Sequence, residues 1–289
     1  MLALTGKVAV ITGATSGIGA RTAEVFVAEG AKVVIAGRRK ERGERLAQKL
    51  GDSASFIPTD VSVEADVKAM INHAVERFGR LDCLVNNAGR GSPFTTIADV
   101  DLNQFDAVLA VHLRAVLAGM KYAAPVMAGQ GSGSIITISS VNGLRAGLGG
   151  HYYSAAKAAS IHLTRCAAME LGEQGIRVNT ISPGMTATGA FGKYAGMQPD
   201  ESDDHPEYAE AAVNAVASRW QALPSVARAD DIAQAALFLA SDASRMITGH
   251  NLVVDGGISA GWPIGAVRGD RELFFRTLKE TLAQAAHSQ

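Results

Sequence analysis

The chain of 289 residues carries 27 basic and 28 acidic side chains, so its formal net charge is −1. This balance lacks the basic excess of a protein that binds nucleic acid or an anionic membrane surface, and we expect neither partner. Hydrophobic residues make up 47% and charged residues 19% of the chain. Such a composition allows a large core and argues against long disordered stretches.

Cys83 and Cys166 are the only cysteines, and neither lies in a CxxC pair. Two thiols cannot staple a fold of this size, so we interpret both as core-packed side chains in a reducing compartment. The N-terminal stretch MLALTGKVAVITG leads directly into strand-like sequence without a secretory signal pattern, and no apolar run approaches a membrane span. The sequence therefore predicts a soluble, cytoplasmic protein.

Short apolar segments alternate with longer segments of helical periodicity along most of the chain. Nearly continuous Val, Ile and Leu predict strands buried on both faces at residues 7–12, 32–37, 54–59, 81–86, 134–139, 176–182 and 250–256. Helical periodicity predicts helices near 17–29, 40–50, 63–78, 101–128, 152–173 and 229–240. This alternation predicts an α/β fold, a doubly wound, Rossmann-type domain over residues 1–261 with a parallel seven-stranded sheet.

Two segments depart from this alternation. Residues 184–228 are too long for a plain connection and contain a polar stretch with two prolines, so we predict a helical lid insertion. The tail, residues 262–289, carries Leu273, Phe274 and Leu278 at helical spacing. We predict a helical tail that covers a core face or makes a subunit contact.

The stretch TGATSGIG, residues 12–19, follows the first strand and opens the first helix. In dinucleotide-binding βαβ units, such glycines make the tight turn, let the backbone approach the pyrophosphate and pack the helix on the strand. The helix N-terminus adds unpaired N–H groups and a partial positive charge. A glycine trio alone is a weak sign, but its place between strand and helix predicts a dinucleotide site. The expected contacts are Gly13, Thr15, Ser16, Gly17, Ile18 and Gly19.

The second predicted strand ends in VVIAGRRK, where the adenosine ribose is expected. An acidic residue there would accept a hydrogen bond from the 2′-hydroxyl and repel a 2′-phosphate, but Gly37 takes that place. Arg38 and Arg39 follow, and arginine binds a dianionic phosphate bidentately. The sequence therefore favours NADP(H) over NAD(H). The alternative is that these arginines are solvated charges that open the next helix.

The stretch HYYSAAKAAS, residues 151–160, contains two tyrosines and a lysine. On a helix, Tyr153 and Lys157 share a face because they are four residues apart, whereas Tyr152 does not share it. Lowering a phenol pKa from about 10 to about 7 takes roughly 4 kcal/mol of phenolate stabilisation. A neighbouring ammonium and an oxidised nicotinamide can supply this in a semi-dry cleft. Ser139 and Ser140 end a strand at the edge where open α/β sheets bind ligands.

Together these motifs resemble the short-chain dehydrogenase/reductase family over residues 5–260. The matching stretches are TGATSGIG, Asp60 in TDV, NNAG at 86–89, the serine–tyrosine–lysine set and PGMTAT at 183–188. The family serine lies thirteen residues before the tyrosine, which selects Ser140 over Ser139 and Tyr153 over Tyr152. The resemblance implies hydride transfer between a nicotinamide dinucleotide and a secondary alcohol or ketone, with Tyr153 as general acid and base.

The resemblance also assigns cofactor contacts and an assembly. Lys157 is implied to bind the nicotinamide ribose, Asp60 to lie at the adenine, and Thr188 near the nicotinamide. The full set of implied contacts beyond the glycine turn is Asp60, Val61, Asn87, Ala88, Gly89, Tyr153, Lys157, Pro183, Gly184, Thr186 and Thr188. Members of the family are commonly homotetramers, and we expect a homotetramer or a homodimer here.

One catalytic position departs from the family pattern. The family has an asparagine in a V-N-L-x-G pattern, which is thought to hold a water that connects the lysine to solvent; here VHLRA places His112 there. Imidazole can donate and accept, and its usual pKa near 6.5 suits a proton relay. We predict that His112 works in this relay, with a space-filling role as the alternative. The other histidines show no ligand spacing, so no metal site is predicted.

Substrate specificity is expected in the loop 142–150, in the insertion 184–228 and in the tail. Aromatic and Met side chains of the insertion favour a carbon-rich substrate, with ordinary packing as the alternative, and Arg145 could favour an anionic group. A 3-oxoacyl-carrier-protein reductase would need a basic docking patch that the sequence does not clearly show. A cofactor-binding protein without catalysis would not need Ser140, Tyr153 and Lys157 together.

Overall fold

The computed structural model describes the backbone of residues 2–287 and the side chains of residues 2–284. Within these residues, seven parallel strands form one sheet in the order β3-β2-β1-β4-β5-β6-β9. The sheet strands are β1 (Val8–Thr12), β2 (Lys32–Gly37), β3 (Ala54–Pro58), β4 (Cys83–Asn86), β5 (Gly133–Ile138), β6 (Ile176–Pro183) and β9 (Asn251–Val254). The predicted strands and the doubly wound fold are confirmed.

The strand order reverses at β1, which pairs with β2 on one side and with β4 on the other. Every residue of β1 is buried, as expected of a central strand with helices on both faces. Open α/β sheets bind ligands at the carboxyl ends of the strands where the order reverses. The turn after β1 and the segment after β4 therefore frame the expected cleft.

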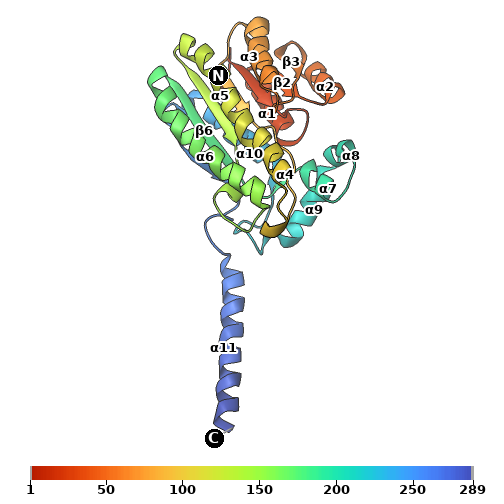
Figure 1. The fold of residues 1–289 in the computed structure, drawn as a ribbon, viewed down its shortest axis with the longest axis vertical. Coiled ribbons are helices and arrows are strands. Elements are labelled where there is room, and N and C mark those ends of the chain that lie inside the picture. Colours follow the sequence, from red (N-terminus) through yellow and green to blue (C-terminus); the bar gives the residue numbers. More distant parts are fainter. Residues whose placement is uncertain (1, 288–289) are drawn as a thin grey trace.

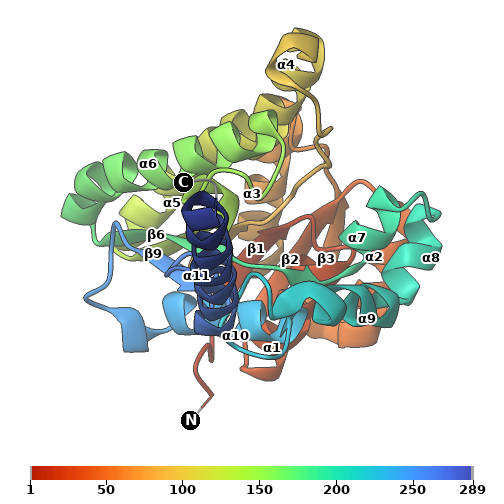
Figure 2. The ribbon, with the colours of Figure 1, turned by 90° about the horizontal axis from the view of Figure 1, so that it is seen from below.

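Helices cover both faces of the sheet (Figure 2). The first face carries α1 (Gly17–Ala28), α2 (Lys40–Leu50) and α10 (Ala229–Ala240). The second face carries α3 (Glu64–Phe78), α5 (Ala115–Gln130) and α6 (His151–Leu171). Five of the six match predicted helices to within a few residues, and α5 is the last part of the predicted helix 101–128. The helix α3 ends at Gly79, whose φ of 83° is the left-handed conformation that glycine adopts without strain.

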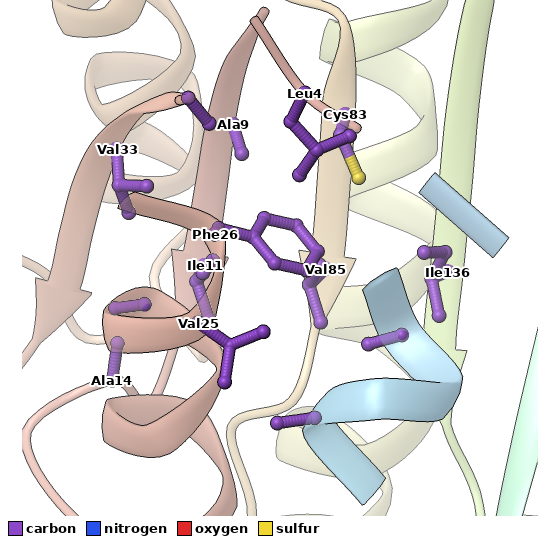
Figure 3. Close-up of a cluster of buried hydrophobic side chains, with 14 of the residues drawn as sticks. Leu4, Ala9, Ile11, Ala14, Val25, Phe26, Val33, Cys83, Val85 and Ile136 are labelled. Carbon is purple, nitrogen blue, oxygen red and sulfur yellow. The ribbon is translucent and has the colours of Figure 1, made fainter. Parts of the chain in front are cut away.

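Phe26 of α1 has no exposed surface and lies at the centre of the first core cluster, beside Ile11 and Val85 (Figure 3). Cys83 belongs to the same cluster, as predicted. Cys166 is exposed, so the prediction that both thiols are core-packed is wrong for this residue. The reason is helical phase, because Cys166 lies on the outward side of α6, between the buried Thr164 and Ala168.

The predicted helix 101–128 consists of α4 (Leu102–Leu109), a π-helical turn (Ala110–Arg114) and α5. By length and composition the whole helix, Leu102–Gln130, could cross a membrane, contrary to the expectation from the sequence. Its buried residues on α5 instead belong to the second core cluster and include Val116, Met120, Ala123 and Met127. The apolar residues of α5 thus contribute to the core of the fold.

The insertion 184–228 is helical, as predicted. It contains α7 (Gly189–Tyr194), α8 (Pro199–Asp204) and α9 (Pro206–Ala217) between two short paired strands, β7 (Thr186–Ala187) and β8 (Ala227–Arg228). Ala187, Val213 and Val226 form a small buried cluster with Phe191 packed against it. The insertion therefore has a core of its own and follows β6 as a compact unit.

The tail forms a helix, α11 (Ile264–His287), as predicted, but it projects away from the body of the protein (Figure 1). Leu273, Phe274 and Leu278 are exposed, so the prediction that the tail covers a core face of its own chain is wrong. Both faces of the sheet are already covered by other helices, which leaves the tail no apolar face to pack on. A subunit contact stays a prediction, and residues 288–289 lie outside the described residues.

Arg145 lies at the base of this tail. Its Nη1 donates to the carbonyl oxygens of Ile258, at 2.8 Å, and Gly261, at 3.4 Å. Its guanidinium stacks on Trp262, 4.4 Å from the ring centroid. These contacts account for Arg145 without an anionic substrate group.

Candidate active site

Ser139 and Ser140 follow β5 at the carboxyl edge of the sheet, and the two serines make different contacts. Ser139 Oγ donates to the carbonyl oxygen of Lys157 at 3.0 Å, which ties β5 to α6. Ser140 is buried in an extended conformation, and its Oγ accepts from the amide of Asn142 at 3.2 Å. A hydrogen bond also joins the side chains of Ser140 and Tyr153. Ser140 is therefore the serine that meets the predicted catalytic tyrosine.

The helix α6 places Tyr153 and Lys157 on one face, as their spacing predicts. The Lys157 Nζ lies 5.4 Å from the centroid of the Tyr153 ring. Tyr152 points elsewhere: it is buried against Val108, and its hydroxyl accepts from the amide of Asp101 at 2.6 Å. Tyr152 is thus a packing residue with a satisfied hydroxyl, and Tyr153 is the tyrosine beside the lysine.

Burial decides which charge states the chain's own groups favour in this pair. Burial raises the pKa of Tyr153 to about 12, and the hydrogen bond with Ser140 only partly opposes that rise. Burial likewise lowers the pKa of Lys157 to about 7. The chain's own groups therefore keep the phenol protonated at neutral pH, because desolvation disfavours both charged forms. The Lys157 Nζ donates to the carbonyl oxygen of Ile138 at 2.6 Å, which holds the amine behind the tyrosine.

Replacing Lys157 by methionine is expected to stabilise the fold by roughly 4 kcal/mol at pH 7, because the Lys157 amine, with a pKa lowered from 10.5 to about 7, binds its proton less tightly in the folded chain than in the unfolded chain. Between pH 7 and about 10.5 the unfolded state binds more protons at this group, so this contribution to stability rises with pH in the wild type. The advantage of Lys157→Met should therefore be largest below pH 7 and shrink as the pH rises. Urea unfolding at several pH values measures it, and a constant difference would contradict the burial cost.

His112 lies in the π-helical turn between α4 and α5 and is 3% exposed. Its ring meets Tyr153 edge to face, with centroids 5.1 Å apart. The Nε2 atom lies 3.0 Å from the carbonyl oxygen and 3.2 Å from the amide nitrogen of Arg90. Among the described residues, Nδ1 is buried and has no hydrogen-bond partner. The turn thus directs an imidazole at the catalytic pair and leaves one ring nitrogen free.

The electrostatics of His112 correct one part of the relay hypothesis. Burial, together with the charge of Lys157, lowers the pKa of His112 to about 3. Both effects favour the neutral ring at physiological pH, so the chain's own groups disfavour a relay through a charged imidazolium. A neutral imidazole can still accept at one nitrogen and donate at the other. The role of His112 in proton transfer stays a prediction in this form.

We expect His112→Ala to slow turnover about tenfold, the value of one lost hydrogen bond, while the Kd of NADPH stays unchanged. His112→Asn should retain most of the rate, because the amide also donates and accepts. The rate of the alanine variant should be lowered uniformly from pH 6 to pH 9, since the wild-type ring does not titrate there. Steady-state pH profiles measure this, and the disappearance of an inflection near pH 6.5 in the variant would show a titrating His112 instead.

The glycine turn fits a dinucleotide diphosphate. A Cβ at Gly13 would lie 2.8 Å from the Ala88 Cα, and one at Gly19 would lie 2.7 Å from the Gly13 carbonyl oxygen. These glycines let α1 and the segment after β4 close tightly on the end of β1. Within the described chain, Ser16 at the start of α1 makes no side-chain capping bond. The first-turn N–H groups of α1 are thus available to an anion.

The segment after β4 is bound to the end of β1. The Asn87 Nδ2 donates to the carbonyl oxygen of Thr12 at 2.8 Å. The amides of Asn87 and Ala88 both donate to Thr12 Oγ1, at 2.9 and 3.0 Å. The predicted residues Asn87 and Ala88 thus lie beside the end of β1, and a Cβ at Gly89 would lie 3.1 Å from His112 Cε1.

At the adenosine end, Gly37 has no room for the missing acid, because a Cβ there would lie 2.8 Å from the Thr15 Cγ2. Asp60 accepts from the amide and the hydroxyl of Ser62, and these bonds, helped by the charge of Arg38, lower the pKa of Asp60. Arg38 is exposed beside this carboxylate. Asp60 and the exposed Arg38 thus lie near each other, and the predicted contacts of Asp60, Val61 and Arg38 with the adenosine stay predictions.

Arg39 is engaged differently from Arg38. Its Nη2 donates to Ser16 Oγ at 2.7 Å, and its Nη1 donates to Asp203 of α8 at 2.6 Å. Sequence reasoning missed this partner and also missed Arg42, whose Nη2 donates to the Asp200 carbonyl oxygen at 3.0 Å. The acidic run DESDD was visible in the sequence, but nothing in it indicated the arginines that it meets.

At the opposite end, Pro183 closes β6, and the amide of Gly184 donates to the carbonyl oxygen of Val254 at 2.9 Å. Thr186 Oγ1 donates to the carbonyl oxygen of Gly184 at 3.2 Å. Thr188 caps α7 and lies next to the glycine turn, since a Cβ at Gly17 would be 3.7 Å from the Thr188 Cβ. The residues predicted to contact the nicotinamide thus lie where the chain leaves β6 and enters the insertion.

A metal-binding site in a protein requires several ligating side chains that lie close together. Among the described residues, no three His, Cys, Asp or Glu side chains lie close enough together to hold a metal ion.

Known proteins resemble this chain over almost the whole of the site. A family described as Enoyl-(Acyl carrier protein) reductase matches residues 13–259. Momilactone A synthase of Oryza sativa subsp. japonica is 46% identical over 89% of this chain and 91% of its own length. (+)-Borneol dehydrogenase 2 of Salvia officinalis is 42% identical over 90% and 91%, respectively. Short-chain dehydrogenase reductase 4 of Arabidopsis thaliana is 43% identical over 89% and 83%. These matches cover both the glycine turn and the tyrosine–lysine helix.

Proposed function

Because the chain belongs to the short-chain dehydrogenase/reductase family and is therefore an oxidoreductase of secondary alcohols and ketones, we propose that it reduces medium-sized, apolar carbonyl compounds with NADPH. One observation carries the chemical part of this proposal. The hydroxyl of Tyr153 is hydrogen-bonded to Ser140, with the Lys157 Nζ 5.4 Å from its ring, at the carboxyl edge of the sheet. The cofactor, when bound, supplies or accepts the hydride.

Residues of the chain donate and accept the proton that is exchanged with the substrate oxygen. Ser140 and Tyr153 present two hydroxyls that can bind the same substrate oxygen. In ketone reduction the Tyr153 O–H donates its proton to that oxygen, and in alcohol oxidation the phenol oxygen takes the proton back. The raised pKa of Tyr153 supports the reduction direction at neutral pH, because the phenol is then already in its acid form. Lys157 holds its amine against the Ile138 carbonyl and stabilises negative charge on the phenol as it develops.

The surroundings of the cleft support a carbon-rich substrate. Tyr194 of α7 is 61% exposed, and its hydroxyl accepts from the amide of Ser92 at 3.3 Å. Phe94 and Ile97, which follow on the same segment, are also largely exposed. Apolar side chains that are held at the mouth of a cleft favour an apolar ligand over a charged one. Relatives named for momilactone A and borneol support a small organic molecule.

The matching family is described as a reductase of an enoyl group on an acyl-carrier protein, and this carrier supports a second candidate, reduction of a 3-oxoacyl group on an acyl-carrier protein. This substrate would need a basic surface at the mouth of the cleft, and the arginines beside the adenosine end are the strongest candidates. Arg39 and Arg42, however, already pair with Asp200, which leaves little free positive charge for an acidic partner. The small-molecule substrate is therefore the better supported of the two.

The remaining features of the proposal concern cofactor, assembly and location. The exposed Arg38 and the space-limited Gly37 support NADP(H), with NAD(H) as the alternative. Leu117 of α5 and Met169 of α6 are exposed apolar side chains and support an assembly of two or four copies. The free thiols of Cys83 and Cys166 support the reducing environment of the cytoplasm.

Fluorescence titration of the purified protein with NADPH and with NADH tests the cofactor. A panel of cyclic ketones, linear ketones and 3-oxoacyl thioesters, assayed by NADPH oxidation, then tests the substrate. The proposal expects tighter binding of NADPH and the highest kcat/KM for apolar ketones. Comparable binding of both nucleotides would overturn the cofactor assignment, and a preference for the thioesters would favour the carrier-protein candidate.

A further inference from the structure

The insertion is bound by charge to the start of α2, on the adenosine side of the cleft. Arg39 Nη1 lies 2.6 Å from the Asp203 carboxylate and 3.1 Å from that of Asp200. Arg42 Nε lies 2.8 Å from the same Asp200 carboxylate, and Arg42 also pairs with Asp204. Figure 2 shows α8 lying alongside α2 on this side of the molecule. We name this cluster the latch; it consists of Arg39 and Arg42 at the start of α2 and of Asp200, Asp203 and Asp204 in α8.

Asp203 is the centre of the latch. Its side chain is 2% exposed, and Lys193 of α7 pairs with it at 2.8 Å in addition to Arg39. Burial raises the pKa of Asp203, but the hydrogen bonds from Lys193 and Arg39 outweigh that effect and hold it below its ordinary value. The carboxylate is therefore ionised, shielded from salt by burial and dependent on its cationic partners. An insertion that moved away from α2 would break this cluster.

The latch contacts the glycine turn, where the diphosphate of the cofactor is expected. Arg39 Nη2 donates to Thr15 Oγ1 at 3.3 Å and to Ser16 Oγ at 2.7 Å, both in the glycine turn. On the other side of the cleft, the Tyr194 hydroxyl accepts from the amide of Ser92. The insertion is thus held on one side near the turn after β1 and on the other at the segment after β4. A dinucleotide bound between these two segments could leave only after the insertion breaks its contacts on one of the two sides.

We propose that Arg39 and Arg42 are positioning residues that hold the insertion closed over the cofactor through Asp200, Asp203 and Asp204, so that breaking the latch governs cofactor release. The inference rests on the proposed function in one respect, that the protein binds a nicotinamide dinucleotide between the turn after β1 and the segment after β4. Arg42 is the residue to test, because it contacts the aspartates and not the glycine turn. Arg45, one turn further along α2 and exposed, is a matched control.

Amide hydrogen exchange of residues 189–217 in the cofactor-free protein measures insertion opening, and a stopped-flow chase of bound NADPH measures release. Arg42→Gln should raise both rates about three- to tenfold, in proportion to the loss of partly exposed ion pairs, whereas Arg45→Gln should change neither. Raising NaCl from about 0.05 to 0.5 M should speed the wild type more than Arg42→Gln. Rates for Arg42→Gln equal to the wild-type rates would overturn the latch.

A charge exchange separates the latch from a general role in folding. Arg42→Asp and Asp204→Arg should each speed exchange and release, and the double variant should restore both toward wild-type values. A double variant as fast as the single variants would overturn the ion-pair assignment. Because hydrogen exchange is measured without nucleotide, it decides the latch even if the protein binds neither NADPH nor NADH. That last result would refute the proposed cofactor alone.

Discussion

Tyr153→Phe is expected to lower kcat for ketone reduction by about 10²- to 10⁴-fold, the usual contribution of a positioned general acid. The substitution removes the only proton that the tyrosine can donate, while the ring stays beside His112 and Lys157. The Kd of NADPH should stay within about twofold of the wild-type value, because an aromatic ring of the same shape remains. Single-turnover oxidation of NADPH with a saturating ketone measures the loss.

Tyr152→Phe is the matched control for this prediction. Tyr152 lies one residue earlier on the same helix, but its hydroxyl accepts from the amide of Asp101 instead of facing the cleft. Its removal should cost about 1 kcal/mol of stability and leave kcat nearly unchanged. Equal turnover by Tyr153→Phe and the wild type would refute the acid–base assignment. Equal losses in both variants would indicate damage to α6.

Arg38→Ala is expected to weaken NADPH binding about 30- to 100-fold and to change the Kd of NADH by less than about twofold. A bidentate, charge-assisted hydrogen bond between a guanidinium and a phosphate contributes affinity of this order. NADH has no 2′-phosphate, so it does not make this bond and does not lose it. Arg38→Lys should recover only part of the affinity, because an ammonium keeps the charge and loses the fork. Fluorescence titration at fixed ionic strength measures all four values.

Lys40→Ala controls for the general positive charge of this region. Lys40 is exposed and pairs with Glu44 along α2, so its removal lowers the local charge without touching the ribose position. It should change NADPH affinity by less than about twofold. Equal loss of NADPH and NADH binding in Arg38→Ala would contradict a specific contact with the 2′-phosphate and would point to a structural role for Arg38.

The strands and most helices follow from the sequence because their signals are local. A run such as KVAVIT is apolar on both sides of a strand, and only a parallel sheet covered on both faces buries it. The glycine turn was also predictable, because Gly13 and Gly19 meet backbone that the βαβ unit always brings near them. Spacing on one helix placed Tyr153 and Lys157 on a shared face.

Local spacing did not show how burial would act on those groups. The sequence predicts a phenol made acidic by Lys157 and an oxidised nicotinamide together, which stays a prediction, and the chain's own groups raise the pKa of Tyr153 to about 12. Desolvation depends on how much of the chain closes around a group, and the segments that bury Tyr153 and His112 are distant in sequence. The same holds for His112, whose pKa near 3 reflects burial and the approach of Lys157.

The alternation of apolar and helical segments, the glycine turn and the tyrosine–lysine spacing were enough to predict the doubly wound fold and the shared face of Tyr153 and Lys157, because each is a pattern among neighbours along the chain. The contacts of Arg39 and Arg42 with α8, the exposure of Cys166 and the projection of α11 had no such pattern. They depend on which surfaces remain free once the sheet is covered, and on charges about 160 residues apart that meet only when the insertion folds back over β1.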